Sequence, residues 1–275
     1  SVTGCREGCG QGDINDLAFE PATAVRDGEE VKGFNIRVGG GLARNEPRIA
    51  RDLDVFVDPE EAIEVGGALS ALFRDHGDRE DRFSARMKFL VDEMGAEAIR
   101  ELLQEEYVDF ELDHAGEDLR SEYSYNAGRA NGGHADHVGV HEQKDGTYYV
   151  GLNVLVGRMG AADTRELARL ADEYGSGEVR VTQRQNVLIT DVPEADLDAL
   201  LAEPLLADYS PDPNPFMRGS VACTGTEFCS LSIVETKNRQ VRYARWLKNN
   251  VDLPDGVEDF HIHLSGCTAS CAQPQ

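Results

Sequence analysis

The chain has 275 residues, of which 40% are hydrophobic, so it is long enough to bury a core as one large domain or two to three small ones. No stretch approaches the roughly 18 apolar residues that span a bilayer, and the first residues lack the pattern of an export signal, so we expect a cytoplasmic protein outside the membrane. The 51 Asp and Glu residues outnumber the 27 Lys and Arg residues, and the net charge of -24 argues against nucleic acid as a partner. Acidic residues occur along the whole sequence, which is typical of a halophilic protein that stays soluble in strong salt.

The first half of the sequence predicts a strand followed by helices. Residues 33–38 alternate as a strand does and lead into three glycines at 39–41. Asp58 before Pro59 predicts the start of a helix. An apolar stripe at helical spacing supports it, namely Ile63, Leu69, Leu72 and Phe73. Further helices are predicted over 82–93 and 96–105, and the polar stretch 113–133 is predicted to be a connecting segment.

The second half predicts a β-α-β-α order. Residues 148–156 read as a strand, and Asp163 is expected to cap a helix whose apolar face contains Leu167, Leu170, Ala171 and Tyr174. Residues 178–190 read as one further strand, and Pro193 opens another helix. A proline-rich connector at 210–215 cannot continue a helix or a central strand. The sequence therefore predicts an α+β fold.

Four cysteines occur as two pairs near the end of the chain. Five residues separate Cys223 from Cys229, and three separate Cys267 from Cys271. Four thiolates are the number that a 4Fe-4S cluster requires, and the small residues beside them allow backbone N–H groups to approach the cluster. These cysteines are therefore candidate metal ligands.

Other interpretations of the cysteines remain open. A structural zinc site usually pairs its ligands across two to four residues, so the gap of five fits poorly. A redox disulfide would use only one of the two pairs, and four unrelated thiols are a further alternative. Three histidines at 134, 137 and 141 resemble a metal site only superficially, while His261 and His263 are more typical of surface or core residues.

The cysteine segments resemble the siroheme and 4Fe-4S signature of ferredoxin-dependent nitrite and sulfite reductases. The resemblance rests on 221–229, 234–237 and 264–273, and it extends to 14–19, 38–41, 139–144, 156–158, 174–180 and 210–213, which are similar to the nitrite reductase branch. It implies three parts, namely the end of a first siroheme domain over 1–128, a ferredoxin-like half domain over 129–205, and the start of a second siroheme and 4Fe-4S domain over 206–275.

The resemblance implies cofactors and partners as well. All four cysteines would bind the cluster, and Cys271 would also bridge to the siroheme iron. Ferredoxin would donate electrons for the six-electron reduction of nitrite to ammonia, by a protein that is a monomer when complete. Sulfite reduction is the nearest alternative, and a non-catalytic iron-sulfur electron carrier is a second one.

Several other residues match family positions near siroheme. Arg86 and Lys88 would contact its carboxylates, which require cations and N–H groups, and an ordinary solvated helix face is the alternative for both. The run Gly39, Gly40 and Gly41 would let backbone pass close to a flat ligand, and a plain turn is the alternative for it. Asn186 matches a strand near the cofactor, although a structural hydrogen-bonding role is an alternative for it.

The sequence departs from the family pattern in two ways. Thr268 and Ala269 stand where family members have Pro-Asn, which puts one cofactor contact in doubt. Segments that family members carry before Ser1 and after Gln275 are absent, including most substrate-binding residues, so we expect a fragment and assign no catalytic residue. Cys5 and Cys9 would then be a vestigial counterpart of the last cysteine pair, a second cluster site or surface thiols.

Overall fold

The computed structural model describes residues 1–4, 10–42, 46–119, 136–254 and 260–272. They belong to two units, Ser1–Gly133 and His134–Gln275, and each is described by itself. Among the described residues, no helix is both long and apolar enough to cross a membrane.

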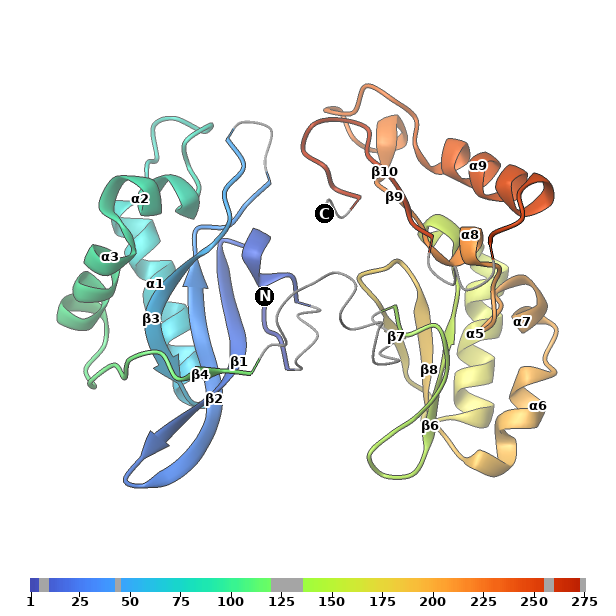
Figure 1. Ribbon diagram of the computed structural model, residues 1–275, viewed down its shortest axis with the longest axis horizontal. Helices are drawn as coiled ribbons and strands as arrows, with labels where there is room; N and C mark the ends of the chain where they lie inside the picture. Colours follow the sequence, from blue (N-terminus) through green and yellow to red (C-terminus); the bar gives the residue numbers. More distant parts are fainter. Residues whose placement is uncertain (5–9, 43–45, 120–135, 255–259, 273–275) are drawn as a thin grey trace. The chain divides into compact units, whose positions relative to one another are not determined.

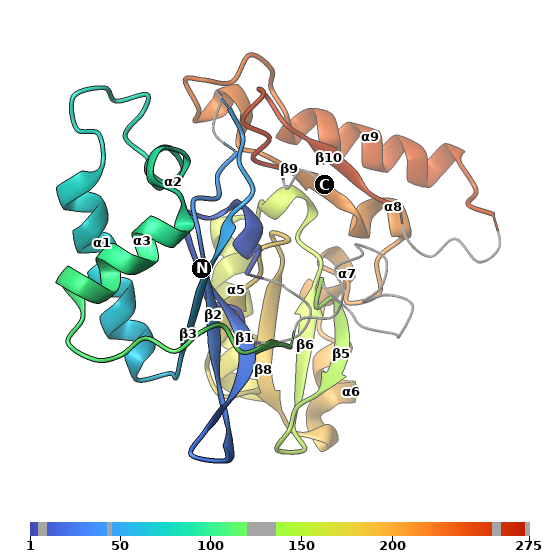
Figure 2. The same cartoon turned by 60° about the vertical axis from the view of Figure 1, so that its left-hand side comes forward.

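The first unit contains a four-stranded antiparallel sheet in the order β3-β2-β1-β4. Its strands are β1 (Leu17–Arg26), β2 (Glu29–Val38), β3 (Arg51–Val57) and β4 (Glu117–Asp118). Three helices cover one face of this sheet (Figure 2), namely α1 (Glu61–His76), α2 (Met87–Met94) and α3 (Ala96–Leu102), followed by a π-helical turn, Leu103–Tyr107. A short 3-10 turn, Gly12–Ile14, precedes β1. Apolar side chains of β2 and β3 pack against the helices in one core, so these elements form a stable layer pair.

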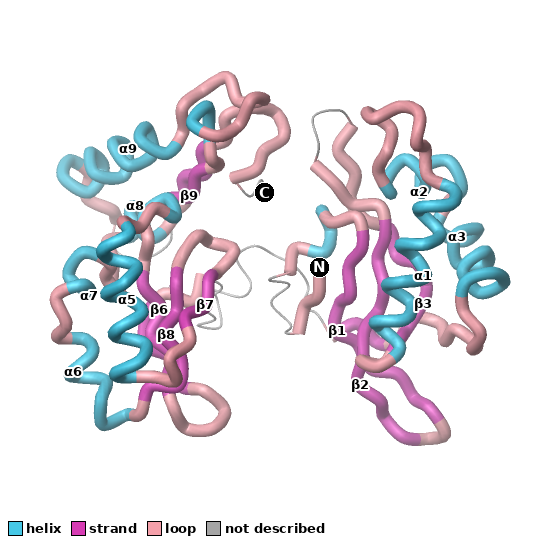
Figure 3. The backbone as a smooth tube through the Cα atoms, turned by 180° about the vertical axis from the view of Figure 1, so that it is seen from behind, coloured by secondary structure: helices cyan, strands magenta, loops and turns pink. Residues whose placement is uncertain are grey.

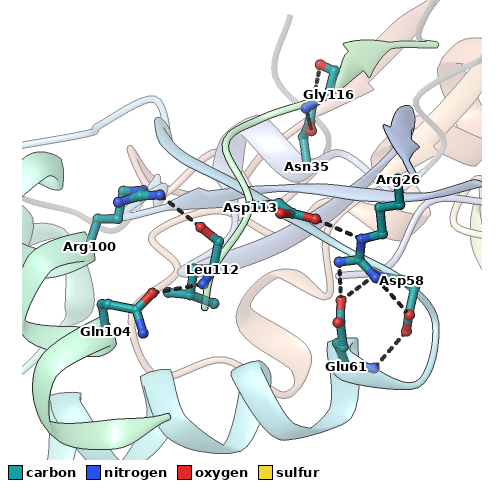
Figure 4. A network of polar contacts seen from close by, with 9 residues as sticks. All are labelled: Arg26, Asn35, Asp58, Glu61, Arg100, Gln104, Leu112, Asp113 and Gly116. Carbon is teal, nitrogen blue, oxygen red and sulfur yellow. Dashed lines mark hydrogen bonds and ion pairs between the residues drawn. The ribbon is translucent and has the colours of Figure 1, made fainter. Parts of the chain in front are cut away.

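Helix α1 begins with a reciprocal pair of hydrogen bonds. The Glu61 N–H donates to the Asp58 carboxylate at 2.9 Å, and the Asp58 N–H donates to the Glu61 carboxylate at 3.0 Å. Figure 4 shows Arg26 between these two carboxylates and that of Asp113, with ion pairs of 3.1, 2.7 and 2.6 Å to Asp58, Glu61 and Asp113. This network fixes the end of β1 against the start of α1.

The second unit contains another four-stranded antiparallel sheet, in the order β5-β6-β8-β7. Its strands are β5 (Gly139–Glu142), β6 (Tyr148–Leu152), β7 (Val179–Val181) and β8 (Val187–Val192). Helices α5 (Ala161–Tyr174), α6 (Leu197–Leu201) and α7 (Leu205–Asp208) lie on one face (Figure 3), where Leu167, Leu170 and Ala171 are buried against the sheet.

The last part of the second unit is built on a parallel strand pair. Strand β9 (Ser220–Ala222) pairs with β10 (Ile262–Leu264), and α8 (Pro215–Arg218) precedes it. Helix α9 (Lys237–Asn250) runs beside both strands (Figure 1), and its buried residues Gln240 and Ala244 face them. The observed mixture of helices and antiparallel sheets confirms the predicted α+β class.

Several local predictions were wrong in detail. Residues 178–190 form a hairpin rather than one strand, because the Thr182 N–H donates to the Asn186 carbonyl and Gln185 has a positive φ of 66°. Asp163 was predicted to cap α5. It lies instead inside the first turn of the helix, which begins after Gly160. Ile63 is 83% exposed, since Val65 and Ala68 form the buried face of α1 with Leu69 and Leu72.

Candidate functional site

Strand pairing brings the two cysteine pairs together within the second unit. Strand β9 ends directly before Cys223, and β10 ends shortly before Cys267, so the parallel register Leu264 to Ala222 aligns the two ends. The Cys223 N–H donates to the Leu264 carbonyl at 3.1 Å. The Gly266 N–H donates to the Cys223 Sγ at 3.2 Å. The Cys223 sulfur, which belongs to the first pair, therefore accepts a backbone hydrogen bond from the loop that contains the second pair.

A second backbone contact joins the two cysteine loops. A 3-10 turn, Gly225–Glu227, follows Cys223, and the Cys229 N–H donates to the Gly225 carbonyl at 3.1 Å. The Ile233 N–H donates to the Gly266 carbonyl at 2.9 Å. The loop after Cys229 is thus tied to the loop before Cys267.

All four cysteines are free thiols. Cys223, Cys229 and Cys267 are partly buried, and Cys271 is exposed. Burial of the Cys271 sulfur nevertheless raises its pKa, and the negative charges of Cys267, Cys223 and Cys229 raise the pKa further. The Cys271 sulfur therefore interacts electrostatically with the sulfurs of the other three cysteines. Over the described parts of the chain, no three His, Cys, Asp or Glu side chains converge on a site for a single metal ion.

Two glycines allow the close approach of the cysteine loops. A Cβ on Gly266 would lie 1.9 Å from the Ser232 Oγ and 3.0 Å from the Val234 carbonyl oxygen. Gly225 has a φ of 66°, and a Cβ there would lie 2.5 Å from the Thr236 Oγ1. Side chains at either position would force the loops apart.

Two residues beside the cysteines carried no predicted role. The fully buried Thr236 donates its hydroxyl hydrogen to the Cys223 carbonyl oxygen at 2.6 Å. The Lys237 Nζ donates to the carbonyls of Val156 and Ala222, the latter at 3.4 Å. Burial lowers the pKa of Lys237 and nearby Arg158 adds to this, whereas the negative charge of Cys223 opposes it. The signal in the sequence was their place in the segment 234–237, which follows the first cysteine pair.

A second group of predicted residues comes together in the first unit. A Cβ built on Gly41 would lie 3.0 Å from the Arg86 Nη2 and 3.7 Å from the Lys88 Cδ. The Arg86 guanidinium makes two hydrogen bonds of 2.8 Å to the Asp16 carboxylate. Lys88 is 1% exposed and donates its Nζ hydrogen to the Glu46 carbonyl at 2.8 Å. Burial lowers the pKa of Lys88, and the charges of Arg86 and Arg48 lower it further.

The other two glycines of the run, Gly39 and Gly40, are required by close packing against neighbouring residues. Gly39 has a φ of 81°, and its Cβ would lie 2.9 Å from a methyl carbon of Val91. A Cβ on Gly40 would lie 2.6 Å from the backbone oxygens of Asp13 and Asn15. Packing within the first unit therefore explains both glycines, whereas Gly41 is the one beside the cations.

Asn186 is buried in the second unit at the turn between β7 and β8. Its side-chain oxygen accepts hydrogen bonds from the Val154 N–H at 2.9 Å and from Asn153 at 3.2 Å. The neighbouring Gln185 donates to the Ala222 carbonyl at 2.8 Å, next to Cys223. Asn186 thus has a structural hydrogen-bonding role one residue away from a side chain that supports the cysteine site.

The remaining candidates contribute less. Cys5, Cys9 and His134 lie outside the described residues. The rings of His261 and His263 are 5.8 Å apart at the start of β10. His137 and His141 both lie against Tyr149, with ring separations of 6.0 and 4.8 Å.

Two family models match the chain. The nitrite and sulphite reductase 4Fe-4S domain matches residues 1–112, and the nitrite/sulfite reductase ferredoxin-like half domain matches 141–207. The four candidate ligands at 223–271 follow both matched ranges.

Curated relatives and a solved structure extend the match over nearly the whole chain. An assimilatory ferredoxin-dependent nitrite reductase of Haloferax mediterranei is 60% identical over 99% of this chain and 47% of its own length. A ferredoxin–nitrite reductase of Synechococcus elongatus is 41% identical over 100% of this chain and 51% of its own length. The structure of the Mycobacterium tuberculosis NirA protein matches 99% of this chain and 47% of its own, with a TM-score of 0.82 and 31% identity.

The chain spans about half the length of the curated relatives that it matches. Within that half, both matched domains and the names of the relatives indicate the same family. The chain therefore belongs to the nitrite and sulfite reductase family.

Proposed function

We propose that this chain is part of a ferredoxin-dependent assimilatory nitrite reductase, whose 4Fe-4S cluster is held by Cys223, Cys229, Cys267 and Cys271. The observation that carries the proposal is the hydrogen-bonded pair of cysteine loops, in which the Gly266 N–H donates to the Cys223 sulfur. Backbone N–H groups aimed at thiolate sulfurs are a common means of tuning iron-sulfur clusters.

The cysteine site fits a cluster in its chemistry. Thiolates are the iron ligands in such clusters, and four of them close together repel one another unless they are protonated or bind cations. The raised pKa of Cys271 reflects this repulsion in part. Iron would relieve the repulsion, and Lys237 supplies a positive charge beside Cys223.

The cations of the first unit fit an anionic cofactor. Siroheme carries many carboxylates, and the side chains of Arg86 and Lys88 both lie beside the buried Gly41. We propose that these residues bind siroheme carboxylates and that the Cys271 thiolate is shared with the siroheme iron. When bound, siroheme would supply the iron at which nitrite is reduced. We also propose that Gly39 and Gly40 in the first unit and Asn186 in the second act indirectly, by fixing the backbone next to residues that would bind the cofactors.

The proposed reaction consumes six electrons, and the donor is ferredoxin. This part of the proposal rests on the activities that the names of the relatives from Haloferax mediterranei and Synechococcus elongatus state. We further propose that the complete protein is a monomer and that the chain divides into siroheme-domain, ferredoxin-like and second siroheme-domain parts over 1–128, 129–205 and 206–275.

The test is turnover by the complete protein that contains this chain, purified without oxygen. Nitrite and sulfite are compared as substrates, with reduced ferredoxin or with reduced methyl viologen as donor. We expect ammonia from nitrite with both donors and siroheme absorption bands in the purified protein. A clear preference for sulfite would replace the nitrite assignment by sulfite reduction. Iron without siroheme bands and without turnover would instead identify a non-catalytic electron carrier.

A further inference from the structure

Helix α9 is basic, whereas the chain as a whole is acidic. Its 14 residues contain five Lys and Arg residues and no Asp or Glu, whereas acidic residues outnumber basic ones almost two to one in the whole sequence. The basic residues are Lys237, Arg239, Arg242, Arg245 and Lys248. A basic helix on an otherwise acidic protein offers a local site for an acidic partner that the remaining surface repels.

One face of α9 combines these cations with exposed aromatic rings. Gln240 and Ala244 are fully buried, and Gln240 donates to the Ser220 hydroxyl at 2.8 Å, so this side of the helix is fixed to β9. Another face contains Arg239, Arg242, Tyr243 and Trp246, at the spacing i, i+3, i+4 and i+7 that defines one helical stripe. We call these four residues the α9 stripe.

The α9 stripe borders a hollow in the surface. The hollow has a volume of about 680 Å³ and is lined by the stripe together with Leu247 and Ile262. Tyr243 is 48% exposed and Trp246 is 59% exposed. Within the described residues, neither Arg239 nor Arg242 forms an ion pair through its side chain. The guanidinium groups and rings are therefore available together for contact.

The composition of the α9 stripe suits a protein partner in strong salt. At 1 M salt, charges more than about 3 Å apart are screened, so long-range attraction contributes little and direct contacts must dominate. Arginine pairs with carboxylates through a planar fork, and Trp and Tyr add apolar contact area. Arg, Trp and Tyr are also the residues enriched at the centres of protein interfaces.

The helix connects this surface to the cysteine site. It begins at Lys237, next to Thr236, whose hydroxyl donates to the Cys223 carbonyl. At about 1.5 Å per residue, Arg242 lies about 9 Å and Trp246 about 15 Å along the helix axis from Thr236. A protein bound at the α9 stripe would thus lie beside the proposed cluster.

We propose that the α9 stripe is the docking surface for an acidic face of the ferredoxin that donates electrons to the proposed cluster. This inference rests on the proposed function, because it assigns a partner to the same cysteine site. Charge complementarity identifies the occupant, since the guanidinium groups of Arg239 and Arg242 require carboxylates opposite them.

Binding can be followed directly, because Trp246 is the only tryptophan in the sequence. Ferredoxin added to the 275-residue chain is expected to quench Trp246 fluorescence in a saturable manner. The Arg239→Gln/Arg242→Gln variant is expected to weaken Kd about 30-fold, which corresponds to about 2 kcal/mol for central interface residues. The matched control, Lys32→Gln/Lys144→Gln, removes two exposed cations elsewhere and is expected to leave Kd within about twofold of the parent.

Kinetics of the complete protein separate docking from chemistry. The arginine variant is expected to raise the KM for ferredoxin and to leave nitrite reduction by methyl viologen unchanged, which also shows that the variant is folded. Equal ferredoxin binding and KM for the arginine variant and the control would overturn the docking surface while the proposed function stands. If the parent protein reduced nitrite with neither ferredoxin nor methyl viologen, the proposed function itself would be wrong. Tighter quenching by a DNA oligonucleotide or by polyglutamate than by ferredoxin would also contradict the assigned partner.

Discussion

The hydroxyl of Thr236 donates a 2.6 Å hydrogen bond to the carbonyl oxygen of Cys223. Thr236 is fully buried, and its Oγ1 also lies 3.7 Å from the Cys223 sulfur. One side chain at the start of α9 thereby fixes both the backbone and the sulfur of the first candidate ligand. The geometry of the cysteine site thus depends on a residue that cannot itself bind iron in the proposed cluster.

Replacing Thr236 tests this dependence. Thr236→Val removes the hydroxyl and leaves the Cys223 carbonyl without its donor, so we expect a loss of about 1–3 kcal/mol in the free energy of unfolding. Iron bound per chain after anaerobic reconstitution should fall as well. Thr236→Ser keeps the hydroxyl and should retain most of the iron. Equal iron content in the two variants would show that the hydrogen bond does not position Cys223.

Gly266→Ala tests the close approach of the two cysteine loops. The added methyl group would lie 1.9 Å from the Ser232 Oγ, so we expect a destabilisation of about 1–3 kcal/mol from overpacking. Urea unfolding of the chain measures it. The matched control is Gly67→Ala inside α1, where nothing lies within 4 Å of the new Cβ and a gain of about 0.5–1 kcal/mol is expected. A neutral Gly266→Ala would contradict the packing described for this loop.

Arg86→Gln tests the cation site in the first unit. Arg86 lies beside Gly41 and holds Asp16 through two hydrogen bonds. Loss of one charge-assisted hydrogen bond to a siroheme carboxylate, about 1.5–3 kcal/mol, should weaken siroheme binding by at least about 10-fold. Siroheme absorbance per protein in the complete protein is the measurement, and the exposed Arg82→Gln is the control. Equal siroheme content in both variants would exclude Arg86 as a contact.

The start of α1 predicts a dependence of stability on pH. The backbone N–H of Glu61 lowers the pKa of the Asp58 carboxyl below its ordinary value of 3.8, and the Glu60 N–H and Arg26 act in the same direction. Because the folded pKa is lower than the unfolded one, this contribution is present above about pH 3.8 and is lost as the pH falls through the folded pKa.

Asp58→Asn isolates the contribution of the Asp58 charge to stability, since Asn also caps helices but carries no charge. Near pH 6 the parent chain should be more stable than the variant by up to about 1 kcal/mol, and the difference should shrink as the pH falls below 3.8. Unfolding in urea at constant ionic strength across this pH range gives the difference. If the stability difference between the parent and the variant grew as the pH fell, this would contradict the lowered pKa of Asp58.

The sequence predicted elements best where local chemistry decides them. Asp58 was correctly placed at the start of α1, and Leu167, Leu170 and Ala171 were correctly placed on the buried face of α5. Local patterns failed at 182–186, where polar residues with strand-like spacing form the turn of a hairpin. Nothing local to the sequence indicates the parallel pairing of β9 with β10, which aligns Cys223 with the Cys267 loop over about 40 residues of chain. The candidate ligands could be named from the sequence, but the supporting roles of Thr236, Lys237 and Gln185 become visible only through long-range contacts.

The central claim is that Cys223, Cys229, Cys267 and Cys271 together hold one 4Fe-4S cluster. Iron and acid-labile sulfide analysis of the anaerobically reconstituted chain, together with electron paramagnetic resonance of the reduced sample, tests it most directly. We predict about four iron and four sulfide atoms per chain, with the signal lost in each of the four Cys→Ser variants. One zinc per chain, or an intact cluster signal after substitution of any of these cysteines, would contradict the account.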